Sequence, residues 1–200
     1  MGADPIEAFL DLARRRRSTR RYRPDPVPEE LLEQVLEAGR WAPSAVNSQP
    51  WEFVVVRDPE VKQALYDLAS VAGLKWKHLL SAPVVIVIVA RKLTPYSRDD
   101  CIFAAQNMML CATDVGLGTC YIGGFAEGRI RKLLSVPEGH IVPGMMTLGY
   151  AEEEPTAPPR RELAGMVHED TYQGRGLDLS HVGRIGRSIV KLLRLQGRQK

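Results

Sequence analysis

Hydrophobic and polar positions along the chain predict helices that alternate with short, widely separated strands. Apolar side chains recur at helical spacing in several segments, while short apolar runs bounded by turns or prolines mark strands. Helices are expected at residues 5–13, 29–39, 61–68, 99–115 and 127–134, and strands at 53–56, 84–90, 119–122 and 142–149. This order favours a sheet covered on both faces by helices.

Two of these segments carry the clearest signal. Residues 84–90 read VVIVIVA behind Pro83 and do not alternate, which is typical of a strand buried on both faces. The helix at 99–115 contains small and soft side chains such as Ala104, Ala105 and Met108, which suit a central, buried position.

The domain organisation is simple. Two hundred residues are enough for one compact domain with a sizeable core. The Pro-rich, acidic segment 152–159 resembles a linker. We expect the main domain at residues 1–176 and a basic, amphipathic tail at residues 177–200. On a helical projection of the tail, apolar residues from Val182 onward share one face, and arginines and lysines share the other.

The charged residues are distributed unevenly. The formal net charge is +3, from 27 basic and 24 acidic residues. Segment 14–23 contains seven arginines and no acidic residue, and its Ser18 and Thr19 add hydroxyl donors. Arginine forks with a hydroxyl suit a phosphate monoester, but a solvated or nucleic-acid-binding patch fits the charge equally well. This segment and residues 181–200 carry thirteen of the 27 basic residues and no acidic one, so the rest of the chain has fourteen basic against 24 acidic residues. A broad nucleic-acid surface is therefore not expected.

Cysteines and histidines show no spacing that indicates a metal site. Cys101, Cys111 and Cys120 are odd in number and far apart, so we interpret them as reduced, mostly buried thiols in a reducing cytosol. The histidines are His78, His140, His168 and His181. They are expected to be surface or capping residues rather than metal ligands or general bases.

The chain shows no targeting or membrane-spanning pattern. Its N-terminal residues lack the basic and long apolar regions of a signal peptide. The longest apolar run, residues 82–90, is much shorter than the ~20 residues of a spanning helix. We therefore expect a soluble, cytoplasmic protein.

Four motifs follow one another along the chain. Residues 16–20 read RRSTR, and residues 42–51 read APSAVNSQPW directly after a helix. Residues 116–125 read GLGTCYIGGF, and residues 158–161 read PPRR. In this order they resemble the FMN-dependent nitroreductase family, and the match extends from about Ile6 to Arg161.

This resemblance implies a fold and an activity. The fold would be α+β, with three α-β-α layers around a central mixed sheet, in an intertwined homodimer with a flavin at each subunit interface. Residues 1–176 would form the FMN-binding domain. The protein would be an oxidoreductase that takes hydride from NAD(P)H and reduces nitroaromatics, quinones or related acceptors. Donor and acceptor would use the same face of the flavin in turn, which gives ping-pong kinetics.

The first motif would bind both ends of the cofactor. By resemblance, Arg16, Arg17 and Ser18 would contact the phosphate and ribityl chain, and Arg20 would reach the N1/O2 edge of the ring. A guanidinium at this edge favours reduced flavin, which tends to carry negative charge at N1. The other arginines of the segment are expected to be exposed to solvent.

The remaining motifs would complete the site, again by resemblance. The second would contact the flavin held mainly by the partner subunit, through Pro43, Ser44, Ala45 and Asn47. The backbone N–H groups of Gly123 and Gly124 would lie against flavin N5, and the late pair Arg160 and Arg161 would return to the phosphate. Residues 49–51 are interpreted as structural. Hydride transfer at N5 requires no catalytic side chain.

Two other functions remain open at this point. A specialised flavin enzyme of the same fold would dehalogenate an aromatic reductively or degrade its own flavin. Such relatives usually carry extra lid sequence, and the span between Leu68 and Ala82 is short. A non-enzymatic phosphate- or nucleic-acid-binding module would use the arginine segment alone. The tail would pack on the dimer or lie on an anionic membrane.

Overall fold

The computed structural model describes residues 5–71, 73–174 and Val182. These residues divide into two units, one ending at Pro155 and the other beginning at Thr156. The division falls inside the linker predicted at residues 152–159. The boundary predicted at residue 176 and nearly all of the predicted tail lie outside the described residues, so both stay predictions.

The first unit contains the helices and strands that the sequence predicts, with bounds shifted by a few residues. Its helices are α1 (Pro5–Arg15), α2 (Glu29–Arg40), α3 (Pro59–Leu68), α4 (His78–Ser81), α5 (Ser97–Asp114) and α6 (Glu127–Leu133), with the 3-10 helix η1 (Ala45–Asn47). Its strands are β1 (Trp51–Val56), β2 (Ser70–Val71), β3 (Leu74–Lys75), β4 (Val84–Arg91), β5 (Gly118–Ile122) and β6 (His140–Gly149). The short elements η1, α4, β2 and β3 were not predicted. The second unit contains the 3-10 helix η2 (Leu163–Gly165).

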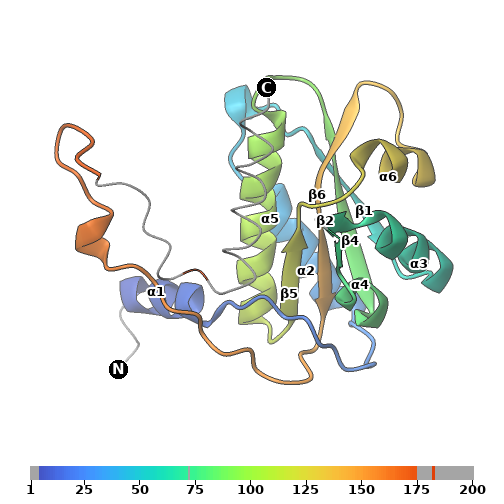
Figure 1. Cartoon of the computed structure of the whole chain (residues 1–200), viewed down its shortest axis with the longest axis horizontal. Helices are drawn as coiled ribbons and strands as arrows, with labels where there is room; N and C mark the ends of the chain where they lie inside the picture. Colours follow the sequence, from blue (N-terminus) through green and yellow to red (C-terminus); the bar gives the residue numbers. More distant parts are fainter. Residues whose placement is uncertain (1–4, 72, 175–181, 183–200) are drawn as a thin grey trace. The chain divides into compact units, whose positions relative to one another are not determined.

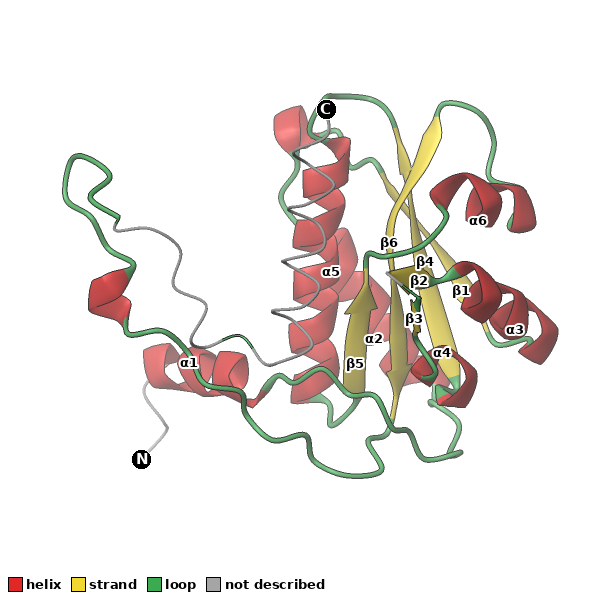
Figure 2. Ribbon diagram, viewed as in Figure 1, coloured by secondary structure: helices red, strands yellow, loops and turns green. Residues whose placement is uncertain are grey.

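The main sheet has four strands in the order β1-β4-β6-β5. All three pairings between these strands are antiparallel. Parallel pairing in the described residues is limited to an isolated bridge between Ser18 and Thr119, at the β5 edge. Figure 1 shows α2 and α5 on one side of the sheet, and α3, α4 and α6 on the other. Figure 2 shows the same three layers by element type, as the α+β prediction requires.

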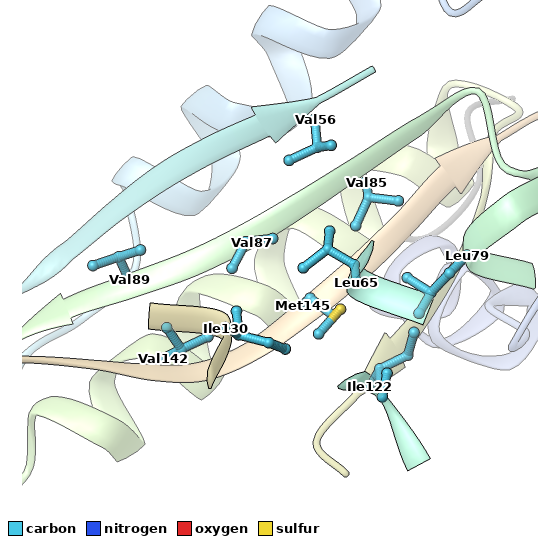
Figure 3. Close-up of a cluster of buried hydrophobic side chains, with 11 residues drawn as sticks. Val56, Leu65, Leu79, Val85, Val87, Val89, Ile122, Ile130, Val142 and Met145 are labelled. Atoms are coloured by element: carbon cyan, nitrogen blue, oxygen red, sulfur yellow. The ribbon is translucent and has the colours of Figure 1, made fainter. Parts of the chain in front are cut away.

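The alternation of side chains along β4 connects the two outer layers. Val85, Val87 and Val89 point into a cluster shared with α3, α4 and α6, which Figure 3 shows. Val84 and Ile86 belong to the cluster formed with α2 and α5. Because both faces are covered, every residue of the run 84–90 is at most 4% exposed. The prediction of a strand buried on both faces is therefore confirmed.

Helix α5 is the long helix that packs on one face of the sheet. Helices α2 and α5 pack closely at Gly39 of α2, where a Cβ would lie 2.8 Å from the side chain of Met108 of α5. Asp100 lies in the first turn of α5, and Asp114 is its last residue. At a rise of 1.5 Å per residue, these two positions are roughly 20 Å apart along the axis.

Candidate functional site

The arginine motif lies against the edge of the sheet. After α1, the chain runs beside β5, where Thr19 N donates to Thr119 O at 2.8 Å and Ser18 forms the parallel bridge. Further on, Arg23 N donates to Tyr150 O at 3.0 Å. The first motif is thereby joined to the strand that leads into Gly123 and Gly124, about one hundred residues later in the chain.

Tyr22 holds the arginine segment to the sheet by hydrogen bonds. Its hydroxyl donates to Thr19 O at 2.9 Å and lies 2.7 Å from Thr147 Oγ1 of β6. Burial raises the pKa of Tyr22 well above its usual range, so the hydroxyl stays neutral and remains a donor. The arginine segment lies very close to the start of β5. A Cβ at Gly118 would lie 2.4 Å from Thr19 Oγ1, so only glycine fits there.

The arginines outside the family motif are paired with acids. Arg14, Arg15, Arg21 and Arg23 are exposed and form ion pairs with carboxylates. The prediction that they face solvent is confirmed.

The motif arginines are different. Within the described residues, Arg17 and Arg20 form no ion pair, and their guanidinium groups donate only to backbone carbonyls nearby in the chain. Burial raises the pKa of the Cys120 thiol, while the charge of Arg20, a hydrogen bond with Ser18 and the charge of Arg16 oppose that increase. Three motif side chains therefore lie around Cys120 on β5.

Two buried polar atoms in the same region have no hydrogen-bond partner among the described residues. They are Thr119 Oγ1 and His78 Nε2, in side chains that are 1% and 4% exposed. The prediction that His78 is a surface or capping residue is therefore wrong. The segment after α3 folds back through β2 and β3, and α4 then carries His78 and Leu79 into the core. Burial, and then the charge of Arg20, lower the pKa of His78 to about 4, so it is neutral near pH 7.

The second motif forms a loop with unusual backbone geometry. Val46, Asn47 and Gln49 have φ angles of 49°, 55° and 44°, in the left-handed region that β-branched residues rarely adopt. Ser44 Oγ accepts from Gln49 N at 3.0 Å, which closes the turn. Gln49 also donates from Nε2 to Asn47 Oδ1 at 3.1 Å.

Asp100 holds this loop to the start of α5. Its carboxylate, in a side chain only 3% exposed, accepts from Ala45 N at 3.1 Å and Ser48 Oγ at 3.5 Å. Sequence reasoning missed this residue. An acid in the first turn of a helix is common, and nothing local distinguished it from Asp99.

The first two motifs lie at opposite ends of α5. The arginine segment starts beside its C-terminal end, where Arg15 Nη2 lies 3.9 Å from Asp114 Oδ1. The loop of the second motif is attached to Asp100, roughly 20 Å away along the helix. One subunit thus brings the first and third motifs together and holds the second apart.

The glycines of the third motif are accessible. Gly123 is exposed, and a Cβ there would make only an ordinary contact, 3.6 Å from the Tyr121 ring. The Gly124 carbonyl accepts from Trp76 Nε1 at 3.1 Å, which fixes the turn after β5. Internal packing therefore does not require a glycine at position 123.

The late basic pair belongs to the second unit. Arg160 Nη1 donates to Pro158 O at 3.1 Å, and Arg161 Nη2 donates to Gly165 O at 2.7 Å. Both side chains are exposed. Their predicted return to the phosphate stays a prediction.

Among the described residues, the cysteines and acidic side chains form no second site. Cys101 and Cys120 are buried, Cys111 is half-buried, and all three are free thiols, as predicted. In the described part of the chain, no cluster of three or more His, Cys, Asp or Glu side chains is arranged to hold a metal ion. No described helix combines the length and apolar character needed to cross a bilayer.

Comparison with known proteins shows the family to which the chain belongs. The model of the nitroreductase family matches residues 13–75 and 69–150. The chain belongs to the nitroreductase family. It is 35% identical over 156 residues to a putative NADH dehydrogenase/NAD(P)H nitroreductase of Methanothermobacter thermautotrophicus, covering 73% of this chain and 78% of that protein.

Two further relatives bear on the chemistry. The solved structure of an FMN-dependent nitroreductase from Clostridium difficile R20291 is 32% identical with a TM-score of 0.74, covering 82% of this chain and 99% of that one. The iodotyrosine deiodinase of Thermotoga neapolitana is 26% identical over 188 residues, covering 84% of this chain and all of that protein. The names of these two relatives denote different reactions, nitro reduction and deiodination.

The residues around β5 fit FMN. Arg17 and Arg20 are cations without an acidic partner in the described chain, which suits a phosphate and an electron-rich ring edge. Thr119 Oγ1 and His78 Nε2 are buried polar atoms that still require a partner.

Proposed function

We propose that this protein is an NAD(P)H-dependent FMN oxidoreductase that reduces nitroaromatics, quinones or related acceptors. The observation that carries this proposal is the pairing of Ser18 and Thr19 with Thr119, which joins the arginine motif to the strand before Gly123 and Gly124. The family membership supplies the cofactor and the nicotinamide donor. When bound, FMN supplies a ring that accepts hydride and passes it on.

In this proposal, the residues of the chain bind the cofactor and orient it. Arg16, Arg17 and Ser18 would hold the phosphate and ribityl chain through charge-assisted hydrogen bonds. Arg20 would place positive charge at the pyrimidine edge of the ring, which favours the reduced form. The Gly124 backbone, fixed by Trp76, would line the reactive edge. Donor and acceptor would occupy the same site in turn.

The working unit in this proposal is a homodimer. The loop of residues 43–47 lies about the length of α5 from the arginine segment of its own subunit, which supports its use at the partner's flavin. Dilution to monomer should then release FMN. Sedimentation with flavin absorbance tests this proposal, and a flavin-loaded monomer would contradict it.

The central experiment is anaerobic reduction of the reconstituted protein. NADH or NADPH should bleach the visible flavin band, and a nitroaromatic or quinone should restore it. A halotyrosine belongs in the same panel because a deiodinase is among the relatives. The short segment between α3 and β4 argues against a large lid for such a substrate. A protein that binds phosphate or nucleic acid but no flavin would overturn the proposal.

A further inference from the structure

Asp100 is a buried acid whose side chain forms hydrogen bonds outside its own helix. It lies in the first turn of α5 and is 3% exposed. Its Oδ1 accepts from Ala45 N at 3.1 Å, and its Oδ2 accepts from Ser48 Oγ at 3.5 Å. Because a buried acceptor without donors is unfavourable, movement of the loop away from Asp100 is opposed.

The two donors lie on either side of the most unusual backbone in the loop. Val46 and Asn47, between them in sequence, have φ angles of 49° and 55°. Residues other than glycine rarely adopt this left-handed region, and β-branched residues do so least readily. Ala45 and Ser48 are half-buried. Val46 is 91% exposed, and Asn47 is exposed as well. Asp100 therefore holds the base of a loop whose strained tip is open to solvent.

The chain on both sides of the loop packs near the same end of α5. Ala104 and Ala105 of α5 are fully buried in a cluster with Trp51 of β1, and Ala42 packs against that cluster. Residues 42 and 51 enclose the loop in sequence. Apolar packing near the start of α5 thus holds both ends of the loop, and the carboxylate of Asp100 holds its base.

Strained backbone that the surrounding structure holds in place is typical of a binding site. We propose that Asp100 is a positioning residue, which holds Ala45 and Asn47 in the conformation that contacts the flavin bound by the partner subunit. This proposal rests on the proposed function, in which the loop serves the partner's site. Asp100 would act through the loop and touch neither the flavin nor the substrates. It would therefore affect the flavin of the other subunit rather than that of its own.

The first test measures FMN affinity by quenching of flavin fluorescence. Asp100→Ala removes both acceptors, and the dissociation constant should rise about tenfold, the value of one hydrogen bond to a charged group. Asp100→Asn keeps an oxygen that can accept from Ala45 N and should recover most of the affinity. Asp99→Ala is the matched control, because Asp99 lies in the same turn of α5 but is exposed, and it should leave the affinity unchanged. Wild-type affinity in an Asp100→Ala dimer would overturn the proposal.

Mixed dimers, purified through a different affinity tag on each subunit, separate positioning from a general loss of stability. In the proposed function, Arg17→Ala weakens the phosphate site of its own subunit. With Arg17→Ala in one subunit and Asp100→Ala in the other, both changes would fall on the same flavin site. The second site would be intact, so one FMN per dimer should bind with wild-type affinity. With both changes in one subunit, each site would carry one change, and neither should bind FMN as tightly as the wild type.

A dimer with one change in each subunit that lacks a wild-type site would overturn the proposal, because Asp100 would then act on its own subunit or on stability alone. If Asp100→Ala does not form dimers, Ser48→Ala replaces it, since it removes the second donor and leaves α5 unchanged. That variant should weaken FMN binding about threefold and show the same pattern in mixed dimers, and unchanged affinity would overturn the proposal. Failure of the wild-type dimer to bind FMN, or an Arg17→Ala dimer with unchanged affinity, would instead count against the proposed function.

Discussion

Tyr22→Phe tests the link between the sheet and the arginine motif. The variant removes one hydroxyl, and with it the donor 2.9 Å from the buried Thr19 carbonyl and the contact 2.7 Å from Thr147 Oγ1. Thr147 can still donate to Cys120 O at 3.4 Å, so the main loss is at Thr19. A buried acceptor left without its donor costs about 1–3 kcal/mol. We expect the free energy of unfolding to fall by about 2 kcal/mol and the Tm by about 4–8 °C.

The same change should weaken cofactor binding. Thr19 lies between Ser18 and Arg20, so loss of its attachment through Tyr22 to Thr147 of β6 should disorder both groups. FMN affinity should fall about tenfold. Stability is to be measured by urea unfolding of flavin-free protein, because bound FMN would add stability by mass action. Affinity is to be measured by quenching of flavin fluorescence.

Tyr121→Phe is the matched control. Its hydroxyl also donates to a backbone carbonyl, that of Pro143 at 3.0 Å, but on β6 and away from the arginine segment. Arg98 Nη1 donates to the same carbonyl at 3.5 Å, so a smaller loss of stability is expected, with FMN affinity unchanged. If Tyr22→Phe lost stability but bound FMN as tightly as the wild type, the anchoring argument would be refuted.

Four further predictions follow from the site and its surroundings. Arg16→Ala should weaken FMN binding by roughly 10- to 150-fold, the value of one hydrogen bond to phosphate, and an unchanged dissociation constant would contradict the phosphate assignment. The folded-state pKa of His78 is about 4 against 6.5 for the free side chain, so the unfolded state binds more protons between these values and stability falls as the pH drops from about 6.5 to 4. After allowance for solvent screening, the His78 contribution is about 2 kcal/mol, and His78→Gln should flatten that part of the pH-stability curve for flavin-free protein. Val46→Gly should stabilise the flavin-free monomer by about 1 kcal/mol, because φ is 49° and the side chain is 91% exposed; a less stable variant would show that Val46 packs against something in solution. Steady-state kinetics with NADH and a quinone should give parallel double-reciprocal lines, and intersecting lines would indicate two separate sites.

The sequence by itself determined the longer helices and strands, the layers and the family. Periodicity reports which face of a helix or strand is apolar, and that depends on residues only a few positions apart. The run at 84–90 was therefore recognisable as a strand with two covered faces, and the helix at 99–115 as a central one. The family motifs are also local, since each depends on residue types at fixed short spacing. The acid-paired arginines were expected at the surface because they fall outside the motif.

Only the tertiary structure decided which motifs meet. Strand pairing and the course of the chain after α1 bring residue 19 to residue 119, and the length of α5 separates Arg15 from Asp100. No local pattern contains either distance. The burial of His78 has the same origin, because two short strands and one helical turn reverse the chain and carry it into the core. The left-handed backbone at Val46 lies in a loop that Asp100, fifty-five residues from Ala45, holds by hydrogen bonds. Local sequence sets the preference of each segment for helix, strand or turn. These contacts depend instead on interactions between segments far apart in the sequence, which meet only in the folded chain.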